Sequence, residues 1–488
     1  MASKTEAQAM AASSDARAQR AMWVVIFIAY HIVTHLQTTL GLGPILAAMP
    51  AFVFMIFSEW VVMRWVGFKS AGAMYTVDGL CSSVSAGIVQ QISKVLMSKA
   101  ILSLGVRMPY EWVYKHYGGL GIGVLEQNET LQKVVAILSS DLAYYWAHRT
   151  YHQINLGWVN HAIHHNSDHY NFATALRQSW GNTATSWIFH LPQAFLVSPA
   201  LFEWSMEWNL IYQFWVHTCL IRRCPEAFEY VFSTPSHHRV HHDRRFHKNF
   251  GGIFIIWDRI FGTFLDETEV EEAHQGRPRA ELTRLEDGEE VAVFGTMMPQ
   301  EKYWIDLLQL QHTISMVRNY ARSPTMKLKL QHLIKGGGFS SATDKGRVLK
   351  RKAVPLERRL RIESTLPVQG GLYVMLHFSA AVVLFILTTV SLDLSKSFLD
   401  VCVGYSGVLL CLASLACIHD VKGFAPYAEI ARCLWMAYRN LGSEDAPQNA
   451  RDPKAIAGIF FLASAMAVGL NTDWLAAKKR TYAASKAA

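Results

Sequence analysis

The sequence predicts an all-α fold: a multi-span integral membrane protein with a histidine-rich di-metal core formed by cytosol-facing helices. The first observation is composition, because 51% of the 488 residues are hydrophobic and only 17% are charged, whereas soluble domains carry roughly 25% charged residues. The second is a set of apolar segments long enough to form membrane helices. The third is that thirteen of the 21 histidines lie between His148 and His247.

The N-terminal part is predicted to begin with a disordered leader and to continue as membrane spans. Residues 1–20 are polar and rich in alanine and serine, a composition typical of an untethered terminus. An apolar run at 22–30 starts the first span, and 43–68 is long enough for the second, since a membrane helix needs about 20 apolar residues. Residues 79–106 are a third candidate, so 21–130 is assigned to N-terminal membrane spans.

The central part, 131–266, is predicted to be the histidine-rich domain. Its first helix, 131–146, is apolar at its start and carries Asp141. The aromatic-rich stretch 187–218 divides near Pro199 and contains two glutamates. It is predicted to be a re-entrant or interfacial hairpin, because proline and charge at membrane depth need protein or water around them.

The C-terminal part combines a basic connection with three further apolar segments. Residues 267–367 are soluble in character, and we interpret them as a cytosolic basic linker that is either solvated or in contact with the lipid surface. Apolar segments at 371–392, 398–418 and 455–470 follow. Residues 368–488 are therefore assigned to C-terminal membrane spans and a tail, which form either a homodimer surface or a lipid anchor.

Charge and cysteine content argue against other classes of protein. The net charge of +8 fits loops that face anionic lipid. No helix-turn-helix, zinc-finger or RNA-recognition pattern is present, so no nucleic-acid partner is expected. None of the seven cysteines falls in a CxxC pair, which argues against a disulfide framework and against a cysteine-based zinc site.

Three histidine clusters carry the chemistry, with the spacings HxxxH, HxxHH and HxxHH. Residues at i, i+3 and i+4 share one face of a helix, so each cluster is expected to present its imidazoles to one point. Eight imidazoles are more than one ion can take and suit two ions with open coordination positions. The eight predicted metal ligands, which are also the predicted catalytic residues, are His148, His152, His161, His164, His165, His238, His241 and His242.

The type of ligand narrows the identity of the metal. Imidazole suits Zn, Cu, Fe and Ni, whereas a structural zinc site closes at four ligands. Eight histidines without cysteine, on membrane helices, therefore favour two redox-active Fe ions. Zn is expected to compete for the same positions, because metal availability competes with affinity.

The strings around these clusters resemble a known family. They are YYWAHRTYH at 144–152, WVNHAIHHNSDHYNFATALRQS at 158–179, TPSHHRVHH at 234–242 and IIWDRIFGTF at 255–264. The histidine pattern resembles the fatty acid hydroxylase/sterol desaturase superfamily of membrane di-iron enzymes, and the strings look like those of its alkylglycerol monooxygenase family. One departure is Gln153, which stands where that family is expected to carry Glu; its amide forms hydrogen bonds but has no charge.

The resemblance implies an oxygenase that uses tetrahydrobiopterin and O2 to hydroxylate the ether-bonded carbon of an alkylglycerol or lyso-ether lipid. The resulting hemiacetal would collapse to a fatty aldehyde and a glycerol derivative. The resemblance also implies a multi-pass protein of the endoplasmic reticulum membrane with its active site facing the cytosol. The residues that it suggests for cofactor or substrate contact are Gln153, Asn171, Arg177 and Gln178.

Further polar residues are predicted to complete or support the site. The resemblance makes His217 a ninth metal ligand, because related hydroxylases carry histidines between the second and third clusters. Asp141 lies two helical turns before His148, so its carboxylate is expected to accept the ring N–H of a ligand and fix the tautomer. The residues predicted to surround the ligands are Asp141, Asp168, Asp258, Gln213 and His237.

The sequence leaves two alternatives, a related oxygenase and a protein of another functional class. The first is a fatty acyl or sterol hydroxylase or desaturase that takes its electrons from cytochrome b5. The second is a membrane metal transporter, although the internal repeats common in transporters are not visible in the sequence.

Overall fold

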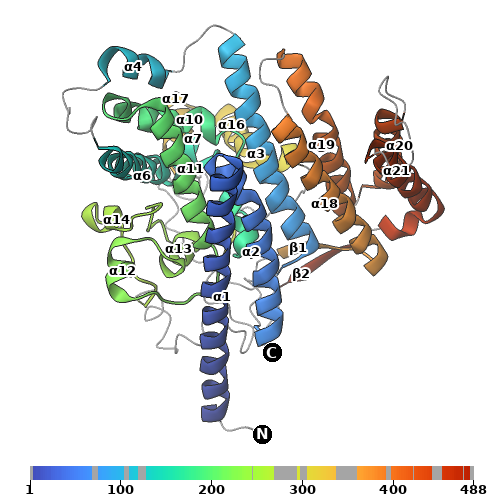
Figure 1. Cartoon of the computed structure of the whole chain (residues 1–488), viewed down its shortest axis with the longest axis horizontal. Helices are drawn as coiled ribbons and strands as arrows, with labels where there is room; N and C mark the ends of the chain where they lie inside the picture. Colours follow the sequence, from blue (N-terminus) through green and yellow to red (C-terminus); the bar gives the residue numbers. More distant parts are fainter. Residues whose placement is uncertain are drawn as a thin grey trace.

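The structure is a computed structural model that describes residues 4–68, 75–103, 109–118, 128–244, 246–268, 294–296, 305–336, 360–391, 397–420, 422–441, 453–475 and 478–483. Helices make up most of these residues, which confirms the predicted helical class. In Figure 1 the N-terminal helices stand in the centre, the central part lies to their left and the C-terminal helices lie to their right.

Helices α1 (Lys4–Leu40) and α2 (Pro44–Val66) pack against each other as a hairpin. Gly41 turns the chain at φ 63°, a conformation that glycine adopts without a side-chain clash. Pro44 occupies the start of α2, where a helix does not use the amide hydrogen that proline lacks.

The predicted disordered leader is instead the first part of α1. The Ser14 hydroxyl donates a hydrogen bond to the Val66 carbonyl at 2.9 Å. Asp15 forms an ion pair with Arg222 at 2.9 Å, and both side chains are mostly buried. A terminus becomes ordered when it is tied to the rest of the fold, and the partners of these residues lie too far along the chain to be recognised from local composition.

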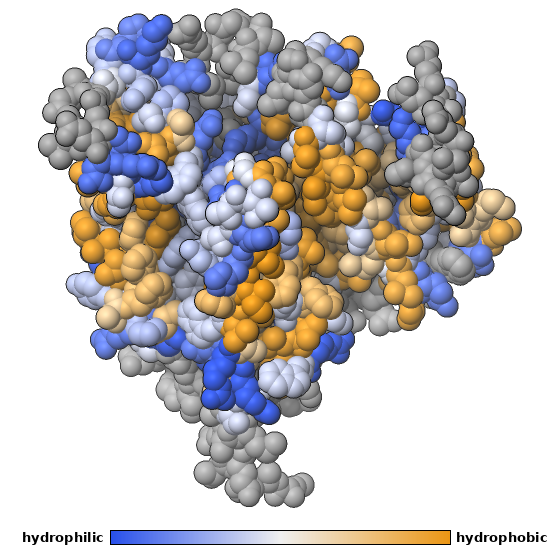
Figure 2. All heavy atoms as spheres, in the orientation of Figure 1, coloured by the Kyte–Doolittle hydropathy of each residue, from blue (hydrophilic) through white to orange (hydrophobic). Residues whose placement is uncertain are grey.

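Four helices within the described residues are long and apolar enough to cross a membrane. They are Ser13–Leu40 of α1, α2, α18 (Val368–Ser391) and α19 (Phe398–His419). The third predicted span and the last apolar segment form α3 (Val77–Ser103) and α21 (Pro453–Leu470), which are helices outside these four. Figure 2 shows apolar side chains over α2 and over α18 and α19, as expected for a membrane protein.

The central part consists of short helices around two longer ones, α6 (Glu129–Gln153) and α11 (Pro199–Trp215), which pack together. Ser198 caps α11 and Pro199 is its first residue, so the predicted division near Pro199 is present. The hydroxyls of Ser140 on α6 and Ser205 on α11 share a 2.6 Å hydrogen bond. The other elements are α4 (Pro109–Tyr117), α7 (Asn155–Trp158), α8 (Ala162–His165), α9 (Phe172–Ala175), α10 (Asn182–His190), η1 (Leu191–Phe195), α12 (Glu226–Val231), α13 (Pro235–His242) and α14 (Ile256–Ile260).

Part of the predicted basic linker folds against this central part. It contains α16 (Ile305–Arg322) and α17 (Met326–Ile334). The Gln309 amide donates to the Gln178 carbonyl at 3.1 Å, and the Asn155 amide donates to the His332 carbonyl at 2.7 Å. These two helices are therefore structural components of the histidine-rich part rather than a spacer.

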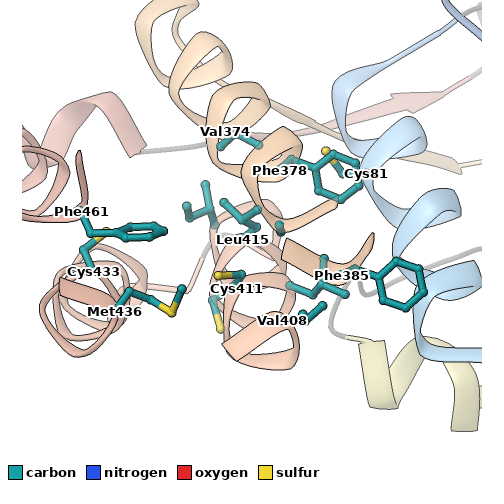
Figure 3. Packing of buried hydrophobic residues seen from close by; sticks show 14 of the residues in the cluster. Cys81, Val374, Phe378, Phe385, Val408, Cys411, Leu415, Cys433, Met436 and Phe461 are labelled. Atoms are coloured by element: carbon teal, nitrogen blue, oxygen red, sulfur yellow. The ribbon is translucent and has the colours of Figure 1, made fainter. Parts of the chain in front are cut away.

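The C-terminal helices α18, α19, α20 (Ala425–Leu441) and α21 enclose an apolar cluster that includes part of α3. Figure 3 shows Phe378 of α18, Leu415 of α19, Met436 of α20 and Phe461 of α21 in this cluster, with Cys81 of α3 at its edge. The C-terminal helices are thus packed onto the rest of the molecule through α3.

One short sheet was not predicted. Strand β1 (Leu360–Thr365) pairs antiparallel with β2 (Lys478–Ala483), so the two ends of the C-terminal part meet.

All seven cysteines lie in the described residues and are free, as the absence of CxxC pairs predicts. The short helix η4 (Thr472–Leu475) precedes β2.

Candidate metal centre

The end of α6 and two short helices bring the predicted histidines together inside the central part. His148 and His152 lie one turn apart near the end of α6. The second cluster lies on α8 and at the residue before it, and the third lies on α13. All eight side chains are buried, which is unusual for a residue type that is only intermediate in its tendency to be buried.

The histidines form two neighbouring groups, and His217 belongs to one of them. In each group the ring nitrogens that could bind an ion lie within 4.8 Å of one another. The first group is His148, His152, His161, His165 and His241, and the second is His164, His217, His238 and His242.

The sequence clusters do not correspond to these two groups. We expected each HxxHH cluster to point at one ion, but His161 and His165 belong to the first group while His164, between them, belongs to the second. His241 is likewise separated from His238 and His242. Adjacent positions on a helix point in different directions, so each short helix contributes to both groups.

The spacing of the Nε2 atoms fits metal coordination. In the first group, successive contacts are 2.9 Å for His148 with His161, 3.0 Å for His161 with His165 and 3.1 Å for His165 with His241. In the second group the Nε2 contacts are 3.3 Å for His164 with His217, 3.0 Å for His217 with His238 and 3.1 Å for His238 with His242. Metal–nitrogen bonds of about 2.0–2.1 Å place neighbouring ligand nitrogens about 2.9–3.4 Å apart, for bond angles from a right angle to tetrahedral.

Hydrogen bonds on the other ring nitrogen fix the tautomer of four of these imidazoles. Each Nδ1 lies within 3.0 Å of a backbone carbonyl, which can only accept a proton. The four pairs are His148 with the carbonyl of Phe250, His164 with that of Arg177, His217 with that of Gln213 and His241 with that of Lys248.

A bound cation would explain why ring nitrogens that have no proton to donate lie so close to one another. His164 and His217 each carry the proton on Nδ1, so their Nε2 atoms face each other at 3.3 Å with lone pairs only. The Nε2 of His152 is buried and has no hydrogen-bond partner. Buried polar atoms almost always have a partner, and a metal ion would supply one for these nitrogens.

Burial keeps the imidazoles neutral, which is the form that binds metal. Burial lowers the pKa of His148 to about 3, although the hydrogen bond to Phe250 acts in the opposite direction. It lowers the pKa of His164 to about 4. The pKa values of the other seven are also lowered, by burial first and by neighbouring histidines.

Asp141 does not accept a hydrogen bond from a histidine of either group, contrary to the expectation. Its carboxylate accepts from the backbone amides of Ile253 and Phe254, from Asn209 and from the Trp257 indole. Because these donors come from the loop at 253–257 and from Asn209, Asp141 holds the loop rather than a histidine. Burial raises its pKa to about 6, against the effect of these hydrogen bonds.

Asp258 acts on the same loop. It accepts from the backbone amides of Phe250 and Gly251 at 2.8 and 2.7 Å and from the Thr263 hydroxyl at 2.7 Å. The Phe250 carbonyl accepts from His148, so Asp258 positions that ligand through the backbone. Asp168 lies half-buried in the connection between α8 and α9.

Glu59 is a positioning residue that the sequence did not identify. It is buried in α2 and accepts hydrogen bonds from the Phe172 amide at 2.9 Å and from the Tyr75 and Thr218 hydroxyls. Thr218 follows His217 directly, so Glu59 links a membrane helix to the second histidine group. A carboxylate inside an apolar span is the sequence signal that could have revealed it.

Of the four residues expected to contact a cofactor, two make hydrogen bonds within the protein and one is exposed. Gln153 is exposed at the end of α6. Asn171 caps α9 by accepting from the Ala173 amide. Arg177 is buried, and its guanidinium donates to the Ile163 carbonyl and to the side chains of Asn166, Ser82 and Ser83. The hydrogen bonds of Arg177 stabilise its buried charge, because a buried cation must have its donors satisfied.

An apolar cavity adjoins the second histidine group. It has a volume of about 910 Å³, including its open mouth, and its wall includes His217, Gln213 and Gln178. Gln213 also accepts from the Tyr144 hydroxyl at 2.7 Å.

His237 lies outside both groups, and its ring contacts Thr234 and Phe264.

A third set of potential ligands, His377, Glu429 and Cys433, lies among the C-terminal helices. The guanidinium of Arg432 donates to Glu429 and, at 2.9 Å, to Nδ1 of His377. A positive side chain therefore already occupies the centre of this set, which does not suit a metal ion.

Comparison with known proteins agrees with this site. The family model for fatty acid hydroxylase matches residues 133–263, so the fold and the two histidine groups define a membrane oxygenase of that class. The chain is 30% identical over 392 residues to alkylglycerol monooxygenase of Danio rerio, covering 79% of this chain and 80% of the relative. The chain belongs to the alkylglycerol monooxygenase family, as the strings around the histidines indicate.

Two further relatives show how far the similarity extends. Alkylglycerol monooxygenase of Homo sapiens is 29% identical over 414 residues, covering 80% of this chain and 82% of the relative. An ornithine lipid hydroxylase of Rhizobium tropici is 27% identical over 146 residues, covering only 27% of this chain and 41% of the relative. No solved structure matches. A match over 80% of the chain cannot fit within residues 1–266, so it extends into the C-terminal part.

Proposed function

We propose that the protein is a monooxygenase that hydroxylates the ether-bonded carbon of alkylglycerol lipids. The hemiacetal formed in this way collapses to a fatty aldehyde and a glycerol derivative. The observation that carries the proposal is the apolar cavity that reaches His217, because it gives a lipid chain direct access to one of two histidine groups. The names of the relatives support the substrate class.

The proposed metal is iron, with five histidines at one ion and four at the other. Bound iron would supply the redox chemistry that activates O2. The chain's own residues contribute in three ways: backbone carbonyls fix the tautomers of the ligands, burial excludes water, and the cavity orients the alkyl chain. Zn would fit the same nitrogens, since imidazole binds both metals.

Tetrahydrobiopterin is the proposed electron donor, on the basis of the family. Of the residues expected to contact a cofactor, Gln178 lines the cavity beside Gln213 and is our candidate for contact with the pterin or the lipid headgroup. We further propose a multi-pass location in the endoplasmic reticulum membrane with the metal centre facing the cytosol. A homodimer formed through the C-terminal spans is part of the same proposal.

The test is aldehyde release by the purified, iron-loaded protein from a 1-O-alkylglycerol in the presence of O2. One arm supplies tetrahydrobiopterin and the other supplies cytochrome b5 with its reductase. We expect turnover in the pterin arm, loss of turnover in His164→Ala, and normal turnover in His116→Ala, since His116 is exposed on α4. Turnover in the cytochrome b5 arm alone would reject the pterin assignment.

Metal analysis separates an oxygenase from a transporter. We expect about two tightly held irons per chain, because each of the two groups has enough nitrogens for one ion. Exchangeable zinc or copper without O2 consumption would favour transport. Loss of His217 should reduce the iron content of the second group while the first group retains its ion.

A further inference from the structure

We propose that helix α18 of the C-terminal part forms the far wall of the lipid cavity and determines which alkyl chain lengths the enzyme accepts. This inference rests on the proposed function, because it assigns the alkyl tail of the substrate to this cavity. It places residues that determine specificity more than a hundred positions beyond the segment matched by the hydroxylase family.

The cavity bridges two parts of the molecule that are far apart in the sequence. Its wall on one side comes from α11 and the residues just after it, including Leu210, Gln213 and His217. On another side it comes from Val382 and Ile386 of α18. Figure 1 shows α11 and α18 on opposite sides of α2 and α3, which supply most of the remaining wall.

The chemistry of the wall gives the cavity a direction. Its polar side chains come from α3, α11 and the residues near the metal centre, whereas α18 contributes only apolar side chains, Val382, Phe385 and Ile386. The oxidised carbon must lie near His217, because it must reach the metal centre. The wall from α2 is apolar as well, so the apolar tail that continues from this carbon runs along α2 and meets the apolar α18 wall, which lies across α2 and α3 from α11.

The α18 wall is firmly held. Phe385 is 4% exposed and packs into the C-terminal cluster, where Figure 3 shows it next to α3. A wall packed in this way cannot move aside for a longer chain without disturbing the cluster. The α18 wall is therefore a fixed boundary for an alkyl chain that extends toward it from His217.

The experiment compares neighbouring positions on one helix. Val382→Phe and Ile386→Phe add volume on the cavity side, while Val383→Phe and Leu387→Phe add it at positions that are 53% and 60% exposed. The substrates are saturated 1-O-alkylglycerols of increasing chain length. Each variant is first checked for wild-type iron content, so that a folding defect is recognised.

We expect the two cavity variants to lose about 10–200-fold in kcat/KM for the longest chains and to keep wild-type values for the shortest, because adding or removing one methylene in an apolar pocket has an effect of that size. The two exposed variants should keep the wild-type profile. Ile386→Ala should shift the preference toward longer chains. An active wild type with the same chain-length profile in all five variants would overturn the inference and leave the proposed function intact.

A second measurement does not depend on turnover. An alkylglycerol probe with a diazirine at the end of its chain is irradiated with the wild-type protein, and labelled peptides are identified by mass spectrometry. Labelling within residues 368–391 that an unlabelled alkylglycerol suppresses supports the inference. Labelling confined to α6 or α11 overturns it. If the wild type cleaves no alkylglycerol but α18 is labelled, the proposed function fails while the binding site stands.

Discussion

Phe250 shows how a residue without polar side-chain atoms can orient a histidine of the candidate metal centre. Its carbonyl accepts the Nδ1 proton of His148 at 2.8 Å, and its amide donates to Asp258 at 2.8 Å. The carboxylate of Asp258 thus fixes one peptide unit, and that peptide unit fixes the imidazole. Partners of this kind usually affect metal affinity or activity 10–100-fold.

Asp258→Asn should therefore weaken metal binding. The asparagine side chain replaces one carboxylate oxygen with an NH2 group, which cannot accept from the backbone N–H groups of Phe250 and Gly251. The loop therefore loses an acceptor, and His148 loses its fixed orientation. We expect about a 10–100-fold weaker iron affinity, measured by competition with a chelator. Asp473→Asn, at an exposed position of η4, serves as the control. An unchanged iron affinity in Asp258→Asn would show that His148 is held by other contacts.

The buried side chain of His190 is expected to make the stability of the protein depend on pH. It is 1% exposed, and burial lowers its pKa from 6.5 to about 4. In the unfolded chain the imidazole takes up a proton near pH 6.5, whereas in the folded protein it stays neutral until about pH 4. Stability is therefore full above pH 6.5 and is lost as the pH falls toward 4.

His190→Leu should remove this contribution. From pH 7 to pH 4, the wild type should lose about 3 kcal/mol of unfolding free energy more than the variant, by about 1.4 kcal/mol per pKa unit. Chemical unfolding in detergent at a series of pH values measures the difference. His116→Leu, at an exposed site, should follow the wild type. Parallel pH profiles for His190→Leu and the wild type would contradict the assignment.

At the scale of the element, α20 carries a buried charged network against α18 and α19. Arg432 donates to Glu429, which also accepts from the Tyr373 hydroxyl at 2.7 Å and from Ser414. Nε2 of His377 lies 3.1 Å from the Ser464 hydroxyl of α21. The network therefore connects all four C-terminal helices, and its charges are compensated within it.

Arg432→Met should destabilise the C-terminal helices strongly. The substitution leaves Glu429 buried without its charge partner, and breaking a buried pair in this way costs about 3–5 kcal/mol. Thermal unfolding in detergent should show the loss. The double variant Glu429→Gln with Arg432→Met should recover much of it, because no charge is left unpaired. Arg439→Met, exposed on the same helix, is the matched control, and an equal loss in the control would reject this explanation.

At the scale of the whole molecule, contacts between distant segments hold the parts together. Glu59 joins the N-terminal hairpin to the second histidine group, β1 joins β2 across the C-terminal part, and Asp15 joins α1 to Arg222. The cavity itself is formed only when α2, α3, α11 and α18 are assembled. Activity should therefore depend on regions far from the histidines.

Asp15→Ala tests one of these long-range contacts. The ion pair with Arg222 is mostly buried, so its loss should lower the unfolding free energy by about 1 kcal/mol, toward the upper end for pairs of this kind. Arg17→Ala, at an exposed position of the same helix, should have no effect. Thermal unfolding of the two variants side by side gives the comparison, and equal stability would mean that the start of α1 is not anchored by this pair.

Much of the architecture could be predicted because its signals are local. Four of the predicted apolar segments are helices long enough to span a membrane, since hydropathy and length decide that property residue by residue. Histidine spacing likewise gave the eight buried imidazoles and, through the family, His217. The small sheet and the packing of α16 could not be predicted, because their pairing depends on residues more than a hundred positions away.

Composition, hydropathy and motif spacing are properties of short stretches, and they were enough to identify a helical membrane protein of the alkylglycerol monooxygenase family with a histidine-rich centre. The tertiary structure was needed to see how the histidines divide between two groups, since adjacent helical positions point in different directions. It alone showed that Asp141 and Arg177 support loops and ligands indirectly, and that α18 closes the cavity. These features depend on which distant groups come within hydrogen-bond or van der Waals distance, and only packing sets that.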